Sequence, residues 1–576
     1  MSGMTKKNEA ALPKGAASSI FRILFPILTG LLAFFAVAAS VDVADDCPAT
    51  FDGPGLTFDE GFYVGGGAYL VESIRRNGVA SLHPQTLQDI FNDPLYLPDH
   101  PPLGRLWLGL VTVWLHQPGD DDPRPYLVTF ARYGSAVLFG LLVGMITCFV
   151  GKWGAPPVAA GGSAVALVTM PRLFGHSHLA TLEPMMDLTY AATILFTADR
   201  LAGKERLQWK DGVLPGILLG LALLTKMQGV FLVPLLTIWL LGNWRWQGIL
   251  SLVVVAVTSF AVFFVGWPWL WTDPLPRIWE YFARSTERPI IYCYYLGTRY
   301  ADRDVPWHYP WVMFTVTMPL LWLALGTWGL VPRDSNKAAA RRWQLLIGGM
   351  ALPFIVFTIP GVPVYDGVRL FLVSFPLWGV FVGMGVHRLL TNPTSPSDEM
   401  SHDTKRRKWV VNWGTVFLFA SVVGSLWRLH PLHLSYFNEL TGGLSGATNL
   451  GMEPTYWGDS VTPEFLRRCH EKLPDGATVA IAPVLHPAIL SEMWPHHTWL
   501  RHRPDLQFVA YDDQQQPLPE YVIVIRRHAD PWASLTPPPE GTKRLAAVER
   551  SGVFLAELLK LPVEDAIRDR EPETVP

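Results

Sequence analysis

The chain has 576 residues, of which 50% are hydrophobic and 16% are charged, with a formal net charge of −3 and a mean hydropathy of +0.23. Soluble domains carry about 25% charged residues, so the polar surface is too small for a water-exposed globule of this length. No basic domain stands out in the sequence, which argues against nucleic-acid binding. The composition therefore predicts an integral membrane protein, and its 24 tryptophans suit the aromatic belts of membrane interfaces.

Apolar runs long enough to cross a membrane recur along the chain. A helix needs about 20 residues to cross roughly 30 Å of hydrocarbon. On this basis the sequence predicts an α-helical polytopic fold with eleven transmembrane helices, at residues 20–41, 127–150, 157–172, 179–198, 212–225, 228–243, 247–271, 310–331, 343–362, 367–387 and 409–428. The first run ends in residues 36–40, which resemble a signal-peptide cleavage site. Because its apolar stretch exceeds the usual length of about 7–15 residues, we expect a retained helix.

The stretch 212–243 admits two interpretations. One long helix would place the basic loop before it and Arg245 after it on opposite faces of the membrane. A turn at residues 226–229 keeps both basic segments on one face. Because Lys and Arg concentrate in cytoplasmic loops, we predict two antiparallel helices here.

The basic residues of the short loops all fall on one side if the helices alternate. This side is the cytoplasm by the positive-inside rule. The sequence thus predicts a multi-pass protein of the cell membrane with a cytoplasmic N-terminus at 1–19, a transmembrane domain at 20–428 and an extracytoplasmic domain at 429–576. The basic residues concerned are Lys6, Lys7, Lys14, Arg200, Lys204, Arg206, Lys210, Arg333, Lys337, Arg341, Arg342, Arg388, Lys405, Arg406, Arg407 and Lys408.

Three large segments then face outward. The first, 42–126, is rich in Asp, Pro and Gly, and the second is 272–309. The third is the tail after 429, whose apolar runs alternate with helical patterns, as is typical of a small α/β domain; the runs lie at 477–482, 520–525 and 552–559. The four cysteines show no metal spacing, and three of them fall in outer segments, where a disulfide and free thiols are both open: Cys47, Cys148, Cys293 and Cys469.

Charged residues near the outer ends of the helices are candidates for chemistry. Asp59 and Glu60 lie in the first outer segment, where a carboxylate could act as a general base or could belong to an exposed acidic loop. Residues 99–105 close the same segment. Two prolines there fix the backbone and set Arg105 beside the membrane, or they serve only to make a rigid helix start.

Two acidic residues lie at the start of the fourth predicted helix. Glu183 and Asp187 are four residues apart, so they share one helix face. Acidic groups in a membrane segment are costly and indicate function by default. The nearby His176 and His178 have a spacing that does not converge on a helix, so we predict no metal site from them.

Lys226 at the predicted turn and Arg369 near the outer end of the tenth helix are the cationic candidates. A Lys or Arg at the centre of a membrane helix costs about 2.5–3.5 kcal/mol, and snorkelling near the edge reduces this cost. Asp366 could also pair with Arg369, so a structural role is as plausible as a functional one. In the functional interpretation the cations hold a lipid phosphate and stabilise the charge that develops on a leaving group.

The second outer segment is both cationic and aromatic. It ends in Pro306-Trp307-His308-Tyr309-Pro310. Such a loop could cover a bound sugar phosphate or form part of an interfacial aromatic belt, and both interpretations stay open. Its arginines are Arg284, Arg288, Arg299 and Arg303.

The order of these features resembles the dolichyl-phosphate-mannose-protein mannosyltransferase-like family of GT-C glycosyltransferases, to which the aminoarabinose transferases of lipid A are related. The similarity covers most of residues 20–460, and the tail after 460 has no recognised counterpart. Each motif is weak alone, but their order together is specific. The motifs are Asp59-Glu60, His100-Pro101-Pro102-Leu103, the acidic start of the fourth helix, Leu224-Thr225-Lys226, residues 306–310, Arg369, residues 436–443 and Tyr456-Trp457-Gly458.

The resemblance implies a transfer of a sugar from a polyprenyl-phosphate carrier to an acceptor hydroxyl on the outer face, with inversion at the anomeric carbon. It implies that Asp59 is the base, supported by Glu60. Glu183 stands where the family more often has Asp, so Asp187 is an alternative. Lys226 and Arg369, with Arg105, would contact the donor phosphate. The candidates for the donor or acceptor pocket are His100, His176, Trp307, His308, Tyr309, Tyr365 and Asp366.

The implied partners are the polyprenyl-phosphate sugar, an acceptor protein, glycolipid or glycan of the cell envelope, and membrane lipids. No cofactor is firmly implied, and a divalent cation is left open. A transporter or flippase of a polyprenyl-linked or other amphiphilic substrate is the alternative function. It predicts charges deep in several helices and broken helices at mid-membrane, whereas the charges here gather at the outer edge. An inactive scaffold is a third possibility, which Asp59, Lys226 and Arg369 argue against mildly.

Overall fold

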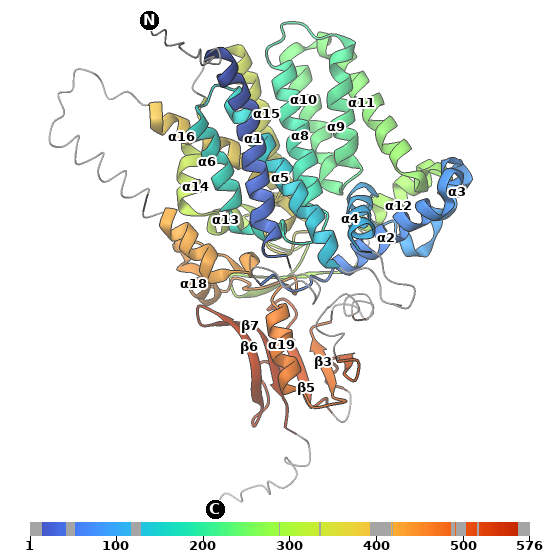
Figure 1. Ribbon diagram of the computed structural model, residues 1–576, viewed down its shortest axis with the longest axis vertical. Helices are drawn as coiled ribbons and strands as arrows, with labels where there is room; N and C mark the ends of the chain where they lie inside the picture. The colour runs from blue at the N-terminus through green and yellow to red at the C-terminus, as the bar shows by residue number, and fades with distance from the viewer. Residues whose placement is uncertain are drawn as a thin grey trace, which may run out of the picture.

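The computed structural model describes residues 14–41, 52–116, 128–286, 289–332, 336–391, 416, 419–484, 490, 503–514 and 518–562. A bundle of long helices occupies the upper part of the molecule in Figure 1, and a small domain built on a β-sheet lies below it. The two parts meet along the lower ends of the helices. The predicted helical fold class with a small C-terminal α/β region is therefore confirmed at this level.

Helices follow the predicted apolar runs closely, with bounds that differ by several residues. They are α1 (Lys14–Ala38), α5 (Val128–Lys152), α6 (Pro157–Val168), α7 (Pro171–His176), α8 (Glu183–Leu201), α9 (Val213–Leu223), α10 (Leu232–Trp244), α11 (Trp246–Gly266), α13 (Tyr309–Thr317), α14 (Leu320–Gly329), α15 (Lys337–Thr358) and α16 (Ser374–Thr391). Short 3₁₀ turns join them, namely η3 (Trp209–Gly212), η4 (Met227–Phe231), η5 (Pro268–Trp271) and η6 (Arg369–Phe371).

The number of membrane crossings is smaller on strict criteria than the eleven predicted. Within the described ranges, three helices are long and apolar enough to cross a membrane: α5, the segment Met227–Trp244 and α11. The helices α13 and α14 make a fourth if they count as one span, but they are bent by 113°. Pro319 lies at this bend. Proline interrupts the helix there because it has no backbone N–H to donate to the preceding turn. Eleven crossings therefore stay a prediction, and residues 409–415, 417 and 418 of the last predicted span lie outside the described residues.

The turn predicted at residues 226–229 is present. The helix α9 ends at Leu223, and α10 begins at Leu232 after η4. The indole nitrogen of Trp244, at the end of α10, donates to the carbonyl of Lys204, which precedes α9, over 3.0 Å. The far ends of both helices therefore lie on the same side, and the prediction of two antiparallel helices is confirmed.

The first outer segment is more helical than its composition suggests. It forms α2 (Glu60–Asn77), η1 (Gly78–Leu82), α3 (Pro84–Asn92), η2 (Pro94–Tyr96) and α4 (Leu103–Leu115). The helices α2 and α4 pack at backbone distance, since a Cβ added at Gly109 would lie 2.1 Å from the carbonyl carbon of Gly67. Only glycine permits this approach. The close packing fixes the first turn of α2, where Asp59 and Glu60 lie.

The second outer segment contains one helix and a hairpin. The helix α12 (Pro274–Thr286) is followed by β1 (Tyr292–Tyr295) and β2 (Thr298–Ala301), which pair antiparallel. The amide of Gly297, in the hairpin turn, donates to the carbonyl of Gly451 over 3.0 Å. The hairpin thus joins the tail rather than lying free on the membrane surface. Arg288, one of the predicted arginines, lies outside the described residues.

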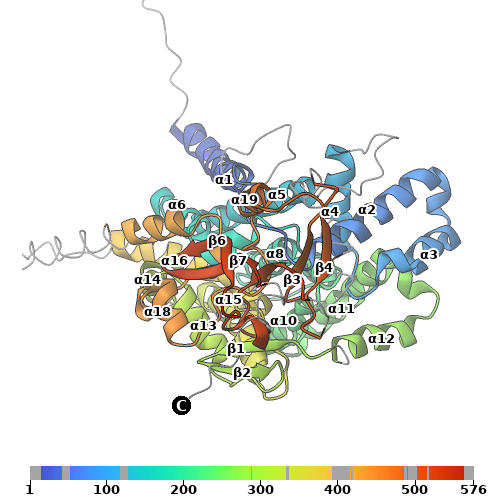
Figure 2. The ribbon, with the colours of Figure 1, turned by 90° about the horizontal axis from the view of Figure 1, so that it is seen from below.

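The tail carries the predicted strands. A five-stranded sheet has the order β4-β3-β5-β7-β6, parallel between β3 and its two neighbours and antiparallel elsewhere. Seen from below in Figure 2, its strands lie across the lower end of the helix bundle. The elements are η7 (His433–Ser435), η8 (Glu439–Thr441), α18 (Gly443–Asn449), α19 (Pro463–Lys472), β3 (Thr478–Ala482), β4 (Gln507–Ala510), β5 (Tyr521–Ile525), η11 (Ala533–Leu535), β6 (Lys543–Arg550) and β7 (Val553–Lys560).

The cysteines that the structure describes are free thiols: Cys148, Cys293 and Cys469. Cys47 lies outside the described residues. The thiols of Cys293 and Cys469 are buried, and burial raises the pKa of each because the thiolate loses its hydration.

Candidate active site

Asp59 is held at the boundary between the helix bundle and the C-terminal domain. It is the residue immediately before α2. The strand-like segment before it pairs with the tail, because the amide of Gly55 donates to the carbonyl of Asp459 over 2.8 Å and the amide of Phe58 donates to the carbonyl of Trp457 over 3.2 Å. The position of the Asp59 side chain is thus set by both parts of the molecule.

Arg369 lies at the centre of a cluster of charged side chains from four distant segments. Its guanidinium forms an ion pair with Asp59, and its Nε lies 2.8 Å from Glu183 Oε1. Its Nη1 lies 3.2 Å from Asp366 Oδ2. The guanidinium carbon also lies 4.0 Å from the ring centre of Trp457, a distance at which the ring quadrupole attracts a cation. One arginine therefore joins three carboxylates and an aromatic face.

Lys226 brings a second cation to the same carboxylate. Its Nζ lies 2.5 Å from Glu183 Oε1, the oxygen that also faces Arg369. Glu183 is the first residue of α8 and is followed by Pro184. Proline suits the first turn of a helix, and the positive end of the helix dipole favours a carboxylate there. The amide of Leu103, at the start of α4, donates to the carbonyl of Leu224 over 3.0 Å, so the turn that carries Lys226 adjoins the first outer segment.

A left-handed turn presents Arg369 to the cluster. Asp366 and Gly367 have φ values of +55° and +63°, a region that is strained for residues other than glycine. A Cβ at Gly367 would lie 3.0 Å from the Tyr456 ring. The hydroxyl of Tyr309 donates to the carbonyl of Gly367 over 3.2 Å. Strained turns of this kind gather at functional sites, and here the turn directs Asp366 and Arg369 toward each other.

The members of the cluster differ in exposure and in hydrogen bonding. The side chain of Asp59 is 32% exposed, whereas those of Glu183, Lys226 and Arg369 are 3%, 7% and 7% exposed. Asp59 is thus the member that a molecule from outside would meet first. Within the described residues, Glu183 Oε2 and Asp187 Oδ1 accept no hydrogen bond. Buried polar atoms rarely lack a hydrogen-bond partner, and a bound group or a water molecule would supply one here.

Glu60, predicted to support Asp59, faces away from the cluster. Its carboxylate receives Nε and Nη2 of Arg132 at 2.8 and 2.9 Å. It also accepts the amides of Thr57 and Ala180 at 2.8 and 2.6 Å. Because its oxygens are occupied by fixed donors, Glu60 holds the segment before α2 in place, which is a structural role.

Arg105 also lies differently from the prediction of a phosphate contact. Its guanidinium lies 2.6 Å from Asp99 Oδ1 and 2.8 Å from the carbonyl of Tyr96, so it closes the loop before α4. The neighbouring His100 lies 5.8 Å from Tyr63, ring to ring. Burial lowers the pKa of His100 to about 4, and the cations Lys226 and Arg105 act in the same direction. The His100 ring is therefore neutral near pH 7 and can border the cluster without adding charge.

The remaining candidates border the cluster or lie apart from it. His176 is buried with its ring 5.4 Å from that of Trp457, and Tyr365 precedes the left-handed turn. Asp187 lies one helical turn beyond Glu183. His308 meets Tyr295 over 2.9 Å and Trp307 is 63% exposed, so these two belong to the hairpin region. In the described ranges, no group of three or more His, Cys, Asp or Glu residues could hold a metal ion.

Three residues of the site were not among the predicted ones. Tyr63 accepts a hydrogen bond from Arg369 at its hydroxyl over 3.4 Å, and Trp457 stacks on the same guanidinium. Arg527 lies 3.1 Å from Asp366 Oδ1. The motif Tyr456-Trp457-Gly458 was a usable signal for Trp457, and the spacing of Tyr63 from Asp59 by one helical turn was a signal for Tyr63. Nothing in the sequence around Arg527 indicates its contact with Asp366.

Comparison with known proteins gives a family match for part of the chain. The family model described as Dolichyl-phosphate-mannose-protein mannosyltransferase matches residues 92–282. No curated protein matches the chain by sequence. The matched segment includes Asp99, His100 and Arg105, the acidic start of α8 and the turn with Lys226.

Three solved structures to which the chain is similar are distant from it in sequence. ArnT from Cupriavidus metallidurans bound to undecaprenyl phosphate is 15% identical, with 94% of this chain and 98% of that chain covered and a TM-score of 0.46. The Archaeoglobus fulgidus oligosaccharyltransferase tethered with an acceptor peptide is 12% identical, with 85% and 64% covered and a TM-score of 0.42. The S. cerevisiae Pmt1-Pmt2 complex bound to the sugar donor is 18% identical, with 50% and 40% covered and a TM-score of 0.29.

These TM-scores are low, so the assignment rests on the matched segment and its motifs. The resemblance stated from the sequence is confirmed there. Over residues 92–282 the chain is similar to the dolichyl-phosphate-mannose-protein mannosyltransferase family.

Proposed function

We propose that this protein transfers a sugar from a polyprenyl-phosphate carrier to an acceptor hydroxyl on the outer face of the membrane. The observation that carries the proposal is the meeting of Asp59, Glu183, Lys226 and Arg369 in one cluster, with Asp59 as its exposed member. A base and a cation are the two groups that this transfer needs, because the phosphate is already a good leaving group. The family domain at residues 92–282 supports the same class of reaction.

The proposed step is a single displacement with inversion. The acceptor oxygen attacks the anomeric carbon and forms the new glycosidic bond, while the bond from that carbon to the phosphate oxygen breaks. The phosphate leaves with the bonding electron pair as polyprenyl phosphate. The carboxylate of Asp59 takes the hydroxyl proton as general base, so atoms and charges balance without a covalent intermediate.

Lys226 and Arg369 are the proposed phosphate contacts. Lys226 faces Glu183, whereas Arg369 is divided among three carboxylates. We therefore give Lys226 the larger share of the charge on the departing phosphate, since a fixed cation in a dry site stabilises developing negative charge strongly. Base and leaving group lie on opposite faces of the sugar in an inverting reaction. The direct ion pair between Asp59 and Arg369 must then open when the donor sugar enters.

The site supplies positive charge from its own side chains, so we propose that the transfer proceeds without a divalent cation. Addition of EDTA to the purified protein should leave turnover unchanged. The acceptor class is a hydroxyl of a protein, glycolipid or cell-envelope glycan. The proposed arrangement in the cell membrane has a cytoplasmic N-terminus at 1–19, a transmembrane domain at 20–428 and an extracytoplasmic domain at 429–576.

The substitution Asp59→Asn tests the proposed function. Full-length protein in liposomes would be given polyprenyl-phosphate mannose or polyprenyl-phosphate aminoarabinose with a cell-envelope fraction, and the release of polyprenyl phosphate would be measured. A positioned general base contributes about 10²–10⁴-fold, so turnover should fall by that factor. The matched control is Asp89→Asn, an exposed carboxylate of α3 in the same outer segment, which should retain wild-type turnover. Wild-type turnover in the Asp59 variant would exclude Asp59 as the base.

Mass spectrometry of co-purified lipid tests the donor class separately. We expect a polyprenyl-phosphate sugar in the wild type and in Asp59→Asn, because the base does not hold the carrier. A transporter of an amphiphile would also retain lipid, but it would release no polyprenyl phosphate from the donor.

A further inference from the structure

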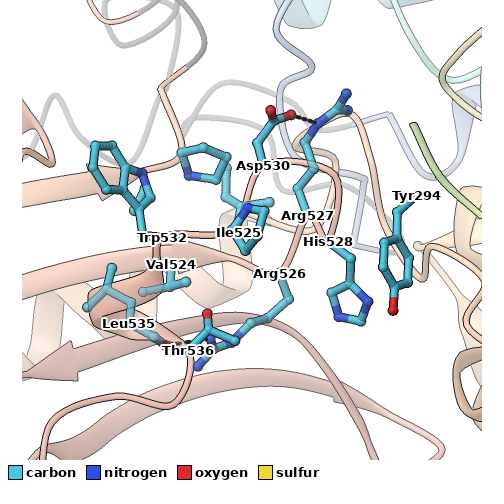
Figure 3. A pocket seen from close by; sticks show the side chains of 13 residues that line it. Tyr294, Val524, Ile525, Arg526, Arg527, His528, Asp530, Trp532, Leu535 and Thr536 are labelled. Carbon is cyan, nitrogen blue, oxygen red and sulfur yellow. Dashed lines mark hydrogen bonds and ion pairs between the residues drawn. The ribbon is translucent and has the colours of Figure 1, made fainter. Parts of the chain in front are cut away.

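Arg527 of the C-terminal domain reaches the charged cluster through Asp366. It follows the end of β5, and its side chain is 1% exposed. It borders a cavity of about 350 Å³ together with Tyr294, His528 and Trp532. Figure 3 shows that its guanidinium turns away from the neighbouring His528 and Arg526, toward Asp530. The group is thus directed out of the cavity and toward the helix bundle.

The guanidinium of Arg527 joins four segments of the chain. It lies 2.7 Å from Asp530 Oδ2 and 3.1 Å from Asp366 Oδ1. It also donates to the carbonyl of Tyr456 and, over 3.3 Å, to the carbonyl of Tyr292. A buried arginine held by two carboxylates and two carbonyls is fixed in place, because a movement would leave buried hydrogen-bonding groups without partners.

Asp366 is shared between two arginines. Its Oδ1 faces Arg527 and its Oδ2 faces Arg369, over 3.1 and 3.2 Å. Its φ value of +55° is unusual for a residue other than glycine, so the conformation requires support from its surroundings. The contact with Arg527 gives this support. Without it, Asp366 would be free to turn fully toward Arg369 and would compete with Asp59 and Glu183 for the guanidinium.

We propose that Arg527 is a positioning residue of the transfer reaction: it holds Asp366 and thereby sets the orientation of Arg369. This inference rests on the proposed function, because Arg369 is a reaction group only if the protein transfers a glycosyl phosphate. It assigns the part of the tail after residue 460, which has no counterpart in the recognised motifs, a role in shaping the active site. Arg527 itself touches no substrate.

The substitution Arg527→Met tests the inference against Arg526→Met. Arg526 is the neighbouring residue and forms an ion pair with the buried Glu557, which keeps a second partner in Arg544. The control thus breaks a buried ion pair of the same domain without touching Asp366. With full-length protein in liposomes and polyprenyl-phosphate mannose as donor, Arg527→Met should lower kcat by about tenfold to a hundredfold, the usual range for a group that orients another. The KM for the donor should change by less than about threefold, since ground-state binding is retained.

Two further variants keep the test decisive. Arg527→Lys retains the charge and should recover most of the lost kcat. Asp366→Asn removes the link while the other contacts of Arg527 remain, so it gives the same information if Arg527→Met does not fold. Combined with Arg527→Met, it should add no further loss. Equal kcat in Arg527→Met and Arg526→Met, or wild-type kcat in Asp366→Asn, would overturn the inference. Absence of donor turnover in the wild-type protein would instead contradict the proposed function.

Discussion

Two buried glutamates, each the first residue of a helix, differ in whether their partners suit a structural or a chemical role. Glu60 begins α2 and Glu183 begins α8, and the side chains are 0% and 3% exposed. Each faces an arginine within 2.8 Å. The carboxylate of Glu60 is surrounded by donors on both oxygens. The carboxylate of Glu183 receives two cations on one oxygen and, within the described residues, no hydrogen bond on the other.

The comparison indicates which buried ion pair is available for a ligand. A fully satisfied polar network is rigid and resists exchange of its partners. An incompletely satisfied one carries a desolvation cost that a bound group would remove. The ion pair of Glu60 with Arg132 therefore stabilises the fold, whereas Glu183 holds Lys226 and Arg369 at the proposed phosphate position.

The largest expected effect follows from breaking the ion pair between Glu60 and Arg132. The substitution Arg132→Met leaves Glu60 buried without its cation, and breaking one partner of a buried pair costs about 3–5 kcal/mol. We expect a large drop in the thermal unfolding temperature of the detergent-solubilised protein. Glu183→Gln should cost less stability, because the amide oxygen of glutamine still accepts a hydrogen bond from Lys226 and Arg369 keeps its ion pairs with Asp59 and Asp366. Equal destabilisation by the two variants would remove the distinction between the two glutamates.

The second effect is on turnover. Lys226→Met removes the cation proposed to contact the phosphate, and loss of one group that stabilises developing charge costs about 10²–10³ in kcat. Lys226→Arg keeps the charge and should retain a measurable part of the activity. The protein should unfold near the wild-type temperature in both variants. If Lys226→Met lowered stability but not kcat, Lys226 would belong to the structural class with Arg132.

The sequence predicted this cluster from separate motifs because each charged residue lies where charge is costly. Lys226, Glu183 and Arg369 all interrupt apolar runs, which marks them as functional or paired. The sequence could not separate Glu60 from Asp59, since the two are adjacent in one motif. Asp59 precedes the first turn of α2 and faces Arg369, whereas Glu60 faces Arg132 near the start of α5.

Three features of the structure could not be predicted from the periodicity of the sequence. The helices α2, α3 and α4 form in a segment rich in Asp, Pro and Gly, because the contact of Gly67 with Gly109 stabilises a packing that composition does not show. The break at Pro319 divides a run that appears continuous in hydropathy. The contact of Arg527 with Asp366 spans 161 residues of the chain, and long-range pairs of this kind leave no local pattern.

A smaller effect distinguishes the two acidic residues of α8. Asp187 lies one turn beyond Glu183 and is nearly fully buried, and within the described residues it has no ion-pair partner in range. We expect Asp187→Asn to lower kcat by less than about tenfold, because it contacts neither proposed phosphate cation. Glu183→Gln should lower kcat more, since it releases both Lys226 and Arg369. A lower kcat in Asp187→Asn than in Glu183→Gln would make Asp187, rather than Glu183, the functional acidic residue of α8.

The smallest expected effect concerns a third carboxylate, Glu453, whose hydrogen bonding is intermediate between that of Glu60 and that of Glu183. It accepts the amide of Ala529 over 2.9 Å and lies near Arg527 without an ion pair to it in the described structure. Burial raises the pKa of Glu453 to about 7, although Arg527 and the Ala529 amide act in the opposite direction. The folded state thus holds a proton that the unfolded chain loses near pH 4.5.

This proton makes stability depend on pH with a definite sign. Because the pKa of Glu453 is higher in the folded state than in the unfolded chain, its contribution to the free energy of unfolding is complete below about pH 4.5. This contribution is lost as the pH rises through about 7. The unfolding temperature of the wild type should fall between pH 6 and pH 8 more than that of Glu453→Gln, which still accepts the Ala529 amide but cannot ionise. Identical pH dependence in the two proteins would show that Glu453 is already ionised in the fold. Glu453 would then resemble Glu60, as an ionised carboxylate whose neighbours supply its hydrogen bonds, and only Glu183 would differ from the other two.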